Sequence, residues 1–245
     1  MVEINHIGII GGGIMGGGIG QTLAQHGYSV SIRDVDEDAI ADTKERVKSG
    51  KFGLESAVKG GYLTEDEKEA ALDRITFTLD IEEAVEDADV IFEAVPEDIH
   101  IKGRVFRQLD ELTDDVPLFS NTSGFSIAAL GNAVEDPSRV GGAHFFSPVP
   151  VMSLVEVVKT PQIDEEYVEA VRELAEDVGK TTVVLEDSQT EYGFIVNRIW
   201  GAMMDEAKAV VNEGIATQEE VNLAMKEGRN LPVGPLEGPG IGEEW

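Results

Sequence analysis

The fold of this chain is decided by residues 4–34, INHIGIIGGGIMGGGIGQTLAQHGYSVSIRD. Residues 4–10 are apolar enough to form a short buried strand, and they run directly into glycines. Residues 14–26 carry apolar side chains at helical spacing, and residues 28–34 have the pattern of a second strand. A strand, a glycine turn, a helix and a second strand in this order predict a βαβ unit.

The glycine turn contains the pattern G-x-G-x-x-G. The first glycine of this pattern permits a tight turn, the second lets the backbone approach a pyrophosphate, and the third allows close packing between helix and strand. The helix that follows would offer free N–H groups and the positive end of its dipole to the phosphates. The residues expected to form this phosphate site are Gly11, Gly13, Ile14, Met15 and Gly16.

Asp34 ends the second strand about 20 residues after the glycines, which is the spacing of the dinucleotide-binding pattern. Its carboxylate can accept hydrogen bonds from both ribose hydroxyls, and its charge would repel a 2′-phosphate. The turn, the helix and the acid together therefore predict a site for NAD rather than NADP. The alternative is a structural glycine turn followed by a surface aspartate.

Strands and helices continue to alternate as far as residue 187. Further strands are predicted at residues 75–79, 90–95, 117–121, 140–146, 155–159 and 181–185, and helices at residues 36–49, 64–72, 101–112 and 164–178. This alternation predicts an α/β fold with a doubly wound, mostly parallel sheet covered by helices on both faces. Beyond residue 187 the pattern is helical only, with a break at Gly214, so we predict domains at 1–187 and 188–245.

The composition excludes several classes of function. Of 245 residues, 48 are Asp or Glu and 19 are Lys or Arg, so the formal net charge is −29. Such a surface would repel nucleic acids and anionic membranes, whereas 42% hydrophobic residues are enough for a core. No apolar run approaches the ~20 residues of a membrane span, and no secretory signal precedes the first strand, so we expect a cytoplasmic protein. The absence of cysteine excludes thiolate catalysis and Cys-ligated metals, and no metal site is predicted.

The net charge also predicts a dependence on salt. Self-repulsion destabilises a compact chain unless salt screens it, and at molar salt the Debye length falls to ~3 Å. We therefore expect a protein from a halophile, whose midpoint of thermal unfolding rises between low and molar salt. Circular dichroism measured at both salt concentrations checks this, and a midpoint that does not rise contradicts it.

His144 and Glu156 are polar residues in otherwise apolar strands. His144 ends the strand predicted at 140–146, and open α/β sheets bind ligands at the carboxyl ends of their strands. A half-buried glutamate needs a partner, and a carboxylate beside a histidine fixes its tautomer and raises its basicity, as the oxidation of an alcohol requires. Spacing alone leaves open whether the two form a catalytic pair or His144 is a satisfied core residue. The other histidines, His6, His26 and His100, are interpreted as structural.

A polar stretch, SNTSG at residues 120–124, follows the strand predicted at 117–121. Its hydroxyl and amide groups could hydrogen-bond a substrate oxygen. They could also cap the helix that begins near Ser126, and from the residues alone we favour the cap.

Six stretches together resemble the 3-hydroxyacyl-CoA dehydrogenase family. They are GGGIMGGGIGQTLAQHGYSV (11–30), IFEAVPEDIHIK (91–102), SNTSGFSI (120–127), HFFSPVPVMSLVEVV (144–158), NRIW (197–200) and LPVGPLE (231–237). The resemblance implies a Rossmann-type domain with a helical hairpin insertion, followed by a helical C-terminal domain that forms much of a dimer contact. We therefore expect a homodimer.

The resemblance also implies a reaction, the NAD-dependent oxidation of the 3-hydroxyl of an acyl-CoA and its reverse, as in fatty-acid β-oxidation. His144 would be the catalytic base and Glu156 its orienting partner. Ser123 would hydrogen-bond the 3-oxygen of the substrate and contact the cofactor. Asn197 would contact the acyl part of the substrate near the reacting carbon.

Four further charged residues are candidates for ligand binding. By resemblance, Glu97 and Lys102 would lie along the nicotinamide side of NAD. Lys48 and Lys51 belong to a cluster of bases at residues 46–59, and we expect them to meet the CoA phosphates. The alternative for the cluster is i,i+4 pairing with neighbouring acids on a solvated helix.

The sequence departs from the family pattern in three places. Ser147 stands where the family has asparagine, and residues 187–194, DSQTEYGF, replace a short D-x-P-G-F turn. After residue 237 the family continues through apolar helices, whereas this chain has only GPGIGEEW, so we expect a shortened helical domain and an altered dimer surface. Two other functions stay open: a related hydroxyacid or sugar-acid dehydrogenase, and a nucleotide-binding protein without turnover.

Overall fold

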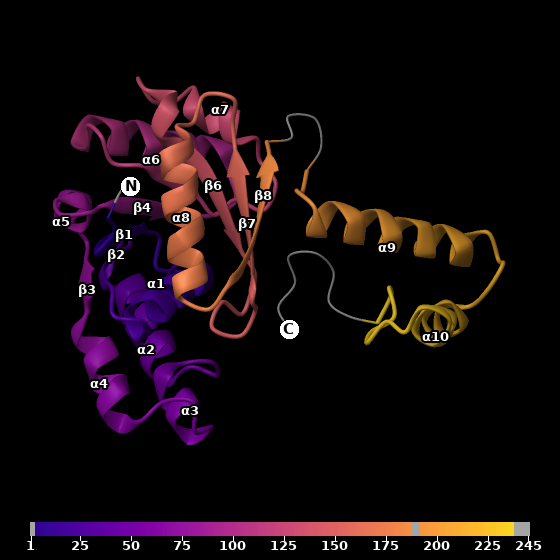
Figure 1. The fold of residues 1–245 in the computed structure, drawn as a ribbon. Coiled ribbons are helices and arrows are strands. Elements are labelled where there is room, and N and C mark those ends of the chain that lie inside the picture. The colour runs from indigo at the N-terminus through magenta and orange to yellow at the C-terminus, as the bar shows by residue number, and fades with distance from the viewer. Residues whose placement is uncertain (1–2, 188–191, 238–245) are drawn as a thin grey trace. The chain divides into compact units, whose positions relative to one another are not determined.

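The computed structural model describes residues 3–187 and 192–237. The chain divides into two compact units, residues 1–189 and residues 190–245. Figure 1 shows the first unit as a sheet with its helices and the second as helices only.

The first unit is built on one eight-stranded sheet with the order β3-β2-β1-β4-β5-β6-β7-β8. Its strands are β1 (His6–Ile10), β2 (Ser29–Arg33), β3 (Ile75–Thr78), β4 (Val90–Glu93), β5 (Leu118–Ser120), β6 (Val140–Phe145), β7 (Leu154–Lys159) and β8 (Thr181–Glu186). All neighbouring strands are parallel except β6 and β7, so the predicted mostly parallel sheet is confirmed. The strand order reverses between β1 and β4, and such a switch point is where open α/β sheets bind ligands.

Helices cover both faces of this sheet. They are α1 (Ile14–Gln25), α2 (Glu37–Ser49), α3 (Leu54–Lys59), α4 (Glu65–Asp73), α5 (Ile81–Val85), α6 (Ile99–Leu112), α7 (Ile127–Gly131) and α8 (Glu165–Asp177), with a 3-10 turn η1 (Pro137–Arg139). Along β1 the side chains of Ile7 and Ile9 enter the core that α1 and α8 share. Gly8, between them, faces α5, where a Cβ would lie 2.9 Å from the Ala84 carbonyl oxygen.

Several element ends differ from the predicted ones for local reasons. β4 ends at Glu93 rather than 95, because Val95 donates its N–H to the Glu93 carboxylate instead of continuing the ladder. α6 starts at Ile99 rather than 101, because the Asp98 carboxylate caps it by accepting from the N–H groups of the second and third residues of the helix. α3 and α5 were not predicted, since five or six residues are too short to show a helical period.

The second unit is helical, as predicted. It contains α9 (Val196–Asn212) and α10 (Gln218–Arg229), separated by Gly214 with φ +71°. Residues 231–237 fold back onto α10, where the Asn222 amide oxygen accepts from the N–H of Leu236 at 2.8 Å. The predicted shortening of this domain concerns residues 238–245, which lie outside the described residues. In the two described ranges, every helix is too short or too polar to cross a bilayer.

Candidate active site

The glycine turn connects β1 to α1 at the switch point of the sheet. Gly11 has φ +102°, and a Cβ there would lie 2.7 Å from the Ala94 carbonyl oxygen. A Cβ on Gly16 would lie 1.8 Å from the Gly11 carbonyl oxygen, so the start of α1 packs too closely on the turn for any side chain at this position. Gly13 is exposed, and a Cβ there would meet nothing within 4 Å. The turn is therefore tight at two glycines and open at the third.

The start of α1 and the end of β2 face this opening. Gly13 is the N-cap of α1, and no side chain of the described residues caps the helix, which leaves its first N–H groups for a ligand. Asp34 follows β2, and its two carboxylate oxygens accept from the N–H groups of Gly12 at 2.8 Å and Val35 at 2.7 Å. An open glycine, an uncapped helix start and a carboxylate beyond β2 together fit a dinucleotide.

Two residues of α2, Thr43 and Arg46, hydrogen-bond the glycine turn. Sequence reasoning missed Thr43, and it placed Arg46 only in the cluster of bases at residues 46–59. The Gly12 carbonyl oxygen accepts from Thr43 Oγ1 at 2.7 Å and from Arg46 Nη1 at 3.4 Å. The signal available in the sequence was weak, because a buried threonine in a charged helix has no pattern of its own.

His144 and Glu156 lie opposite each other on neighbouring strands. The antiparallel register of β6 and β7 pairs these two residues directly, and His144 Nδ1 lies 2.8 Å from Glu156 Oε2. The His144 residue is 4% exposed and Glu156 0%. A buried carboxylate at this distance favours the tautomer with the proton on Nδ1, which leaves Nε2 as the basic nitrogen. The structure thus places a buried acid directly beside the histidine on the neighbouring strand.

The SNTSG stretch does not cap α7, so the cap interpretation is wrong. Ser126 itself accepts from the N–H of Ala129 at 3.3 Å. The Asp187 carboxylate accepts from the N–H groups of Ile127 at 3.1 Å and Ala128 at 2.9 Å. These two acceptors satisfy the start of α7, so no side chain of residues 120–124 is needed there.

The stretch instead bridges β5 and the strand that carries His144. The Asn121 amide oxygen accepts from the N–H of Phe145, the residue after His144, at 2.9 Å. The N–H of Ser123 donates to Glu97 Oε1 at 2.9 Å. In the described part of the chain the Ser123 hydroxyl has no hydrogen-bond partner, so its backbone is held while its hydroxyl is available to a ligand.

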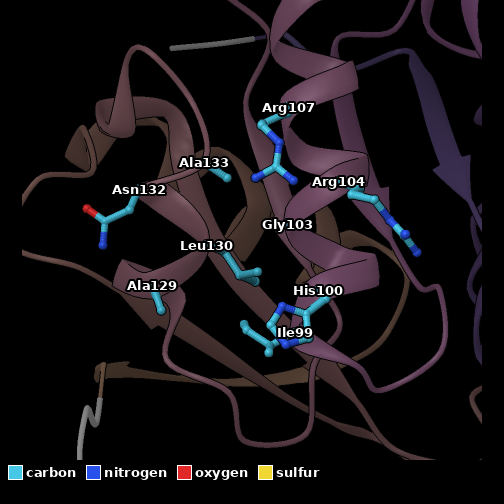
Figure 2. A pocket seen from close by; sticks show the side chains of 9 residues that line it. All are labelled: Ile99, His100, Gly103, Arg104, Arg107, Ala129, Leu130, Asn132 and Ala133. Carbon is cyan, nitrogen blue, oxygen red and sulfur yellow. The ribbon is translucent and has the colours of Figure 1, made fainter.

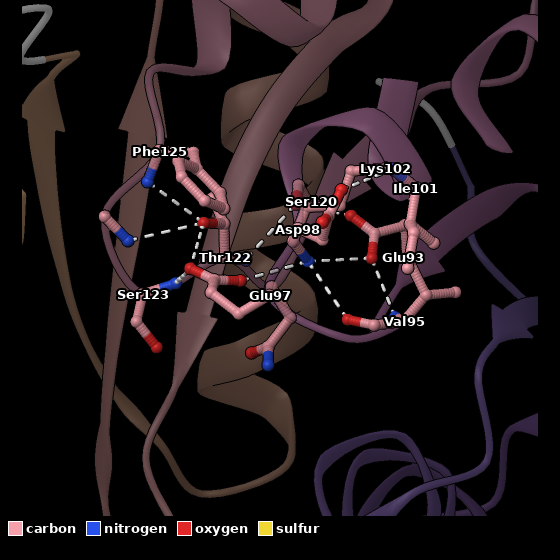
Figure 3. Close-up of polar contacts among 12 residues, drawn as sticks. Glu93, Val95, Glu97, Asp98, Ile101, Lys102, Ser120, Thr122, Ser123 and Phe125 are labelled. Carbon is pink, nitrogen blue, oxygen red and sulfur yellow. Dashed lines mark hydrogen bonds and ion pairs between the residues drawn. The ribbon is translucent and has the colours of Figure 1, made fainter. Parts of the chain in front are cut away.

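Glu97 and Lys102 form one cluster with a residue that sequence reasoning missed, Glu93 (Figure 3). Lys102 is 1% exposed, and its ammonium lies 2.9 Å from Glu93 Oε1 and 3.2 Å from Glu97 Oε2. Glu97 is partly exposed beside Ser123, whereas Lys102 is turned inward. The signal for Glu93 was present, because it is an acid in an apolar strand, as Glu156 is.

The predicted CoA-phosphate residues lie at the end of α2 and just after it, in the helical segment α2 to α4 that corresponds to the expected helical hairpin. Lys48 and Lys51 are both exposed, and no ion pair joins either to an acid of the described ranges. Lys51 Nζ lies 5.1 Å from the centroid of the Phe52 ring. The alternative of i,i+4 pairing holds for Lys59, whose ammonium lies 3.9 Å from a Glu55 carboxylate oxygen.

A hollow of about 330 Å³ lies between α6 and α7 (Figure 2). Its lining includes three side chains of α6, His100, Arg104 and Arg107, together with apolar residues such as Leu130. None of the residues predicted for the cofactor or the reaction lines it.

Three further features of the sequence analysis are located along the chain as follows. Asn197 lies in the first turn of α9, in the second unit. Ser147 is exposed after β6. Most of the loop that departs from the D-x-P-G-F pattern, residues 188–191, lies outside the described residues.

A doubly wound sheet with a glycine turn at its switch point and an acid at the end of β2 defines a Rossmann-type NAD-binding domain. Comparison with known proteins supports this assignment of an NAD-binding domain. Residues 6–188 match the family described as 3-hydroxyacyl-CoA dehydrogenase, NAD binding domain, and residues 193–238 match 3-hydroxyacyl-CoA dehydrogenase, C-terminal domain. The chain belongs to the 3-hydroxyacyl-CoA dehydrogenase family.

Individual relatives that match most of this chain are named as dehydrogenases of hydroxyacyl-CoA or hydroxybutyryl-CoA. The chain is 38% identical over 236 residues to 3-hydroxybutyryl-CoA dehydrogenase of Mycobacterium tuberculosis, which covers 95% of this chain and 80% of that one. It is 35% identical over 242 residues to human mitochondrial hydroxyacyl-coenzyme A dehydrogenase, with 96% and 75% covered. The crystal structure of (S)-3-hydroxybutyryl-CoA dehydrogenase from Ralstonia eutropha superposes with a TM-score of 0.90 at 36% identity, covering 96% of this chain and 81% of that one.

Proposed function

We propose that this chain is an NAD-dependent dehydrogenase that oxidises (S)-3-hydroxyacyl-CoA to 3-oxoacyl-CoA and catalyses the reverse reaction. The observation that carries the proposal is the buried His144–Glu156 pair at the carboxyl end of β6. Membership of the 3-hydroxyacyl-CoA dehydrogenase family over nearly the whole chain supports it. The reaction belongs to the chemistry of fatty-acid β-oxidation.

His144 acts as the general base in oxidation. Its Nε2 takes the proton of the 3-hydroxyl, and the buried Glu156 carboxylate stabilises the imidazolium that forms. When bound, NAD supplies the acceptor for the hydride that leaves C3 of the substrate. In reduction, the protonated His144 returns its proton to the 3-oxygen.

The proposal also assigns the residues that bind NAD and the substrate. The residues proposed to hold NAD are Gly11, Gly13, Ile14, Met15, Gly16 and Asp34, with Glu97 and Lys102 on the nicotinamide side. The Ser123 hydroxyl donates to the 3-oxygen of the substrate, supported by its lack of a partner in the described ranges. Asn197 is assigned the acyl part by family resemblance alone.

The proposed enzyme works as a homodimer in the cytoplasm. Support for the dimer is the helical second unit, which the family resemblance assigns to the dimer contact. Sedimentation equilibrium tests the dimer, and a monomer at micromolar concentration contradicts it.

The decisive experiment follows NADH absorbance during the reduction of acetoacetyl-CoA in molar salt. Turnover by the wild-type chain supports the proposal. Binding of NADH without turnover identifies a nucleotide-binding protein of the same fold. Turnover of free 3-hydroxyacids or sugar acids, with none on acyl-CoA, identifies a related dehydrogenase.

The double replacement Lys48→Glu with Lys51→Glu is expected to raise KM for acetoacetyl-CoA by about tenfold or more, a loss of about 1.4 kcal/mol of binding. The reason is that the two exposed ammonium groups, without ion pairs to acids of the described ranges, would meet the CoA phosphates. The measurement is steady-state kinetics at the lowest salt that keeps the chain folded, since salt screens such contacts.

The matched control for this pair is Lys208→Glu, an exposed lysine of α9 that lies 3.5 Å from an Asp205 carboxylate oxygen. It changes the charge in the same sense outside the hairpin and should leave KM unchanged. A KM that stays at the wild-type value in the double variant rules out the phosphate contact.

A further inference from the structure

Glu93 is a buried carboxylate at the carboxyl end of β4 that the proposed reaction does not use. It is 1% exposed. Its Oε2 accepts from the Ser120 hydroxyl at 2.6 Å, and its Oε1 accepts from Lys102 Nζ at 2.9 Å and from the N–H of Val95 at 2.7 Å (Figure 3). Burial raises the pKa of Glu93, while the Lys102 ammonium and the Ser120 hydroxyl act in the opposite direction. Because burial removes the hydration of a charged carboxylate, such a group needs hydrogen bonds and an opposite charge to compensate.

Lys102 connects Glu93 to a second carboxylate. Its ammonium lies 3.2 Å from Glu97 Oε2 and donates to the Val95 carbonyl oxygen at 3.2 Å. Because the lysine is enclosed, it cannot turn outward to another anion. Glu93 therefore keeps the Lys102 ammonium within ion-pair distance of the Glu97 carboxylate.

Glu97 uses its other oxygen to hold the loop that carries Ser123. Its Oε1 accepts from the Thr122 hydroxyl at 2.6 Å and from the N–H of Ser123 at 2.9 Å. At the start of the same loop, the Ser120 hydroxyl donates to Glu93 and accepts from the N–H of Thr122 at 3.2 Å. The loop is thus tied to Glu93 at both ends, directly through Ser120 and through Lys102 and Glu97.

We propose that Glu93 is a positioning residue for the dehydrogenase reaction, which fixes the Ser123 hydroxyl where it meets the 3-oxygen of the substrate. Glu93 touches neither substrate nor cofactor in this scheme, and it acts only through Lys102, Glu97 and Ser120. The inference rests on the proposed function, because it needs a reaction in which Ser123 takes part.

The experiment is a double-mutant cycle between Glu93→Gln and Ser123→Ala, read as kcat for acetoacetyl-CoA reduction. Glu93→Gln keeps the shape of the side chain and removes the charge that anchors Lys102. Alone it should lower kcat by about 10- to 100-fold, because a misplacement of ~1 Å can cost ~100-fold in rate. In the Ser123→Ala background the same change should cost less than about threefold, because the hydroxyl to be positioned is gone.

A purely structural role for Glu93 would give equal losses of kcat in both backgrounds, which would overturn the inference. The matched control is Asp110→Asn, which breaks another largely buried ion pair, between Asp110 and Arg139, at the other end of α6. This control should lower the melting temperature and leave kcat unchanged. If it lowers kcat as much as Glu93→Gln does, general destabilisation explains both variants and the inference is wrong.

A second variant covers the case in which Glu93→Gln leaves Lys102 too costly to bury and the chain does not fold. The pair Glu93→Gln with Lys102→Met removes both charges together, which is often tolerated where a single unpaired charge is not. It should fold and show the same loss of kcat and the same dependence on Ser123. An unchanged kcat in the pair would overturn the inference. If the wild-type chain does not reduce acetoacetyl-CoA, the proposed function itself fails, and the inference fails with it.

Discussion

Replacement of His144 by alanine should lower kcat for acetoacetyl-CoA reduction by about 10²- to 10⁴-fold, the usual contribution of a positioned general acid or base. His144 is buried with Nδ1 2.8 Å from Glu156, so its imidazole is oriented and its tautomer fixed. Without it, the 3-oxygen has no group to supply its proton. NADH binding should be retained, since the glycine turn and Asp34 belong to other strands.

We would obtain kcat from the steady-state decrease in NADH absorbance, and the Kd for NADH from a fluorescence titration. Glu156→Gln should show a smaller loss than His144→Ala, because the base remains but its tautomer is no longer fixed by a charge. The control is His26→Gln, an exposed histidine whose Nδ1 lies 2.8 Å from the Thr22 carbonyl oxygen within α1. Undiminished activity in His144→Ala refutes the proposed base.

The second large effect is expected at the glycine turn, where two replacements by alanine should behave differently. Gly16→Ala places a Cβ 1.8 Å from the Gly11 carbonyl oxygen, so the turn must move. It should destabilise the chain by about 1–3 kcal/mol, as overpacking does, and abolish NADH binding. Gly13→Ala adds a Cβ that meets nothing within 4 Å, so the melting temperature should hardly change.

Gly13→Ala should nevertheless raise the Kd for NADH about tenfold or more, a loss of about 1.4 kcal/mol, because the new methyl group occupies the space where phosphates approach. Thermal unfolding and NADH titration separate the two variants. The control is Gly103→Ala in α6, where only the tip of Arg107 lies within 4 Å of the added Cβ. It should leave NADH binding unchanged, and equal NADH affinity in Gly13→Ala and wild type would disprove the predicted phosphate site.

The sequence predicted the parts of the fold that depend on local pattern. The βαβ unit at residues 4–34 and the alternation of strands and helices led to the correct sheet class, because hydrophobic period and glycine position are local properties. The helix predicted at residues 64–72 is also determined locally, since Thr64 and Glu67 form a capping box at the start of α4.

Contacts between distant residues could not be obtained in this way. The placement of Lys102 between Glu93 and Glu97 depends on how α6 packs against the end of β4, which no local pattern records. Part of the cap of α7 comes from Asp187, about 60 residues along the chain, so residues 120–124 were given a role that Asp187 fills together with Ser126. The pairing of His144 with Glu156 also required a register that spacing alone left open.

That register has a consequence for the connection between β6 and β7, residues 146–153. Because side chains alternate between the faces of a strand, a slip of one residue would turn Glu156 to the opposite face of the sheet from His144. A single deletion in this connection would therefore separate the proposed proton acceptor from the carboxylate beside it while leaving both side chains chemically intact. The number of residues in this connection is thus as much a determinant of the chemistry as the identity of the two residues that it brings together.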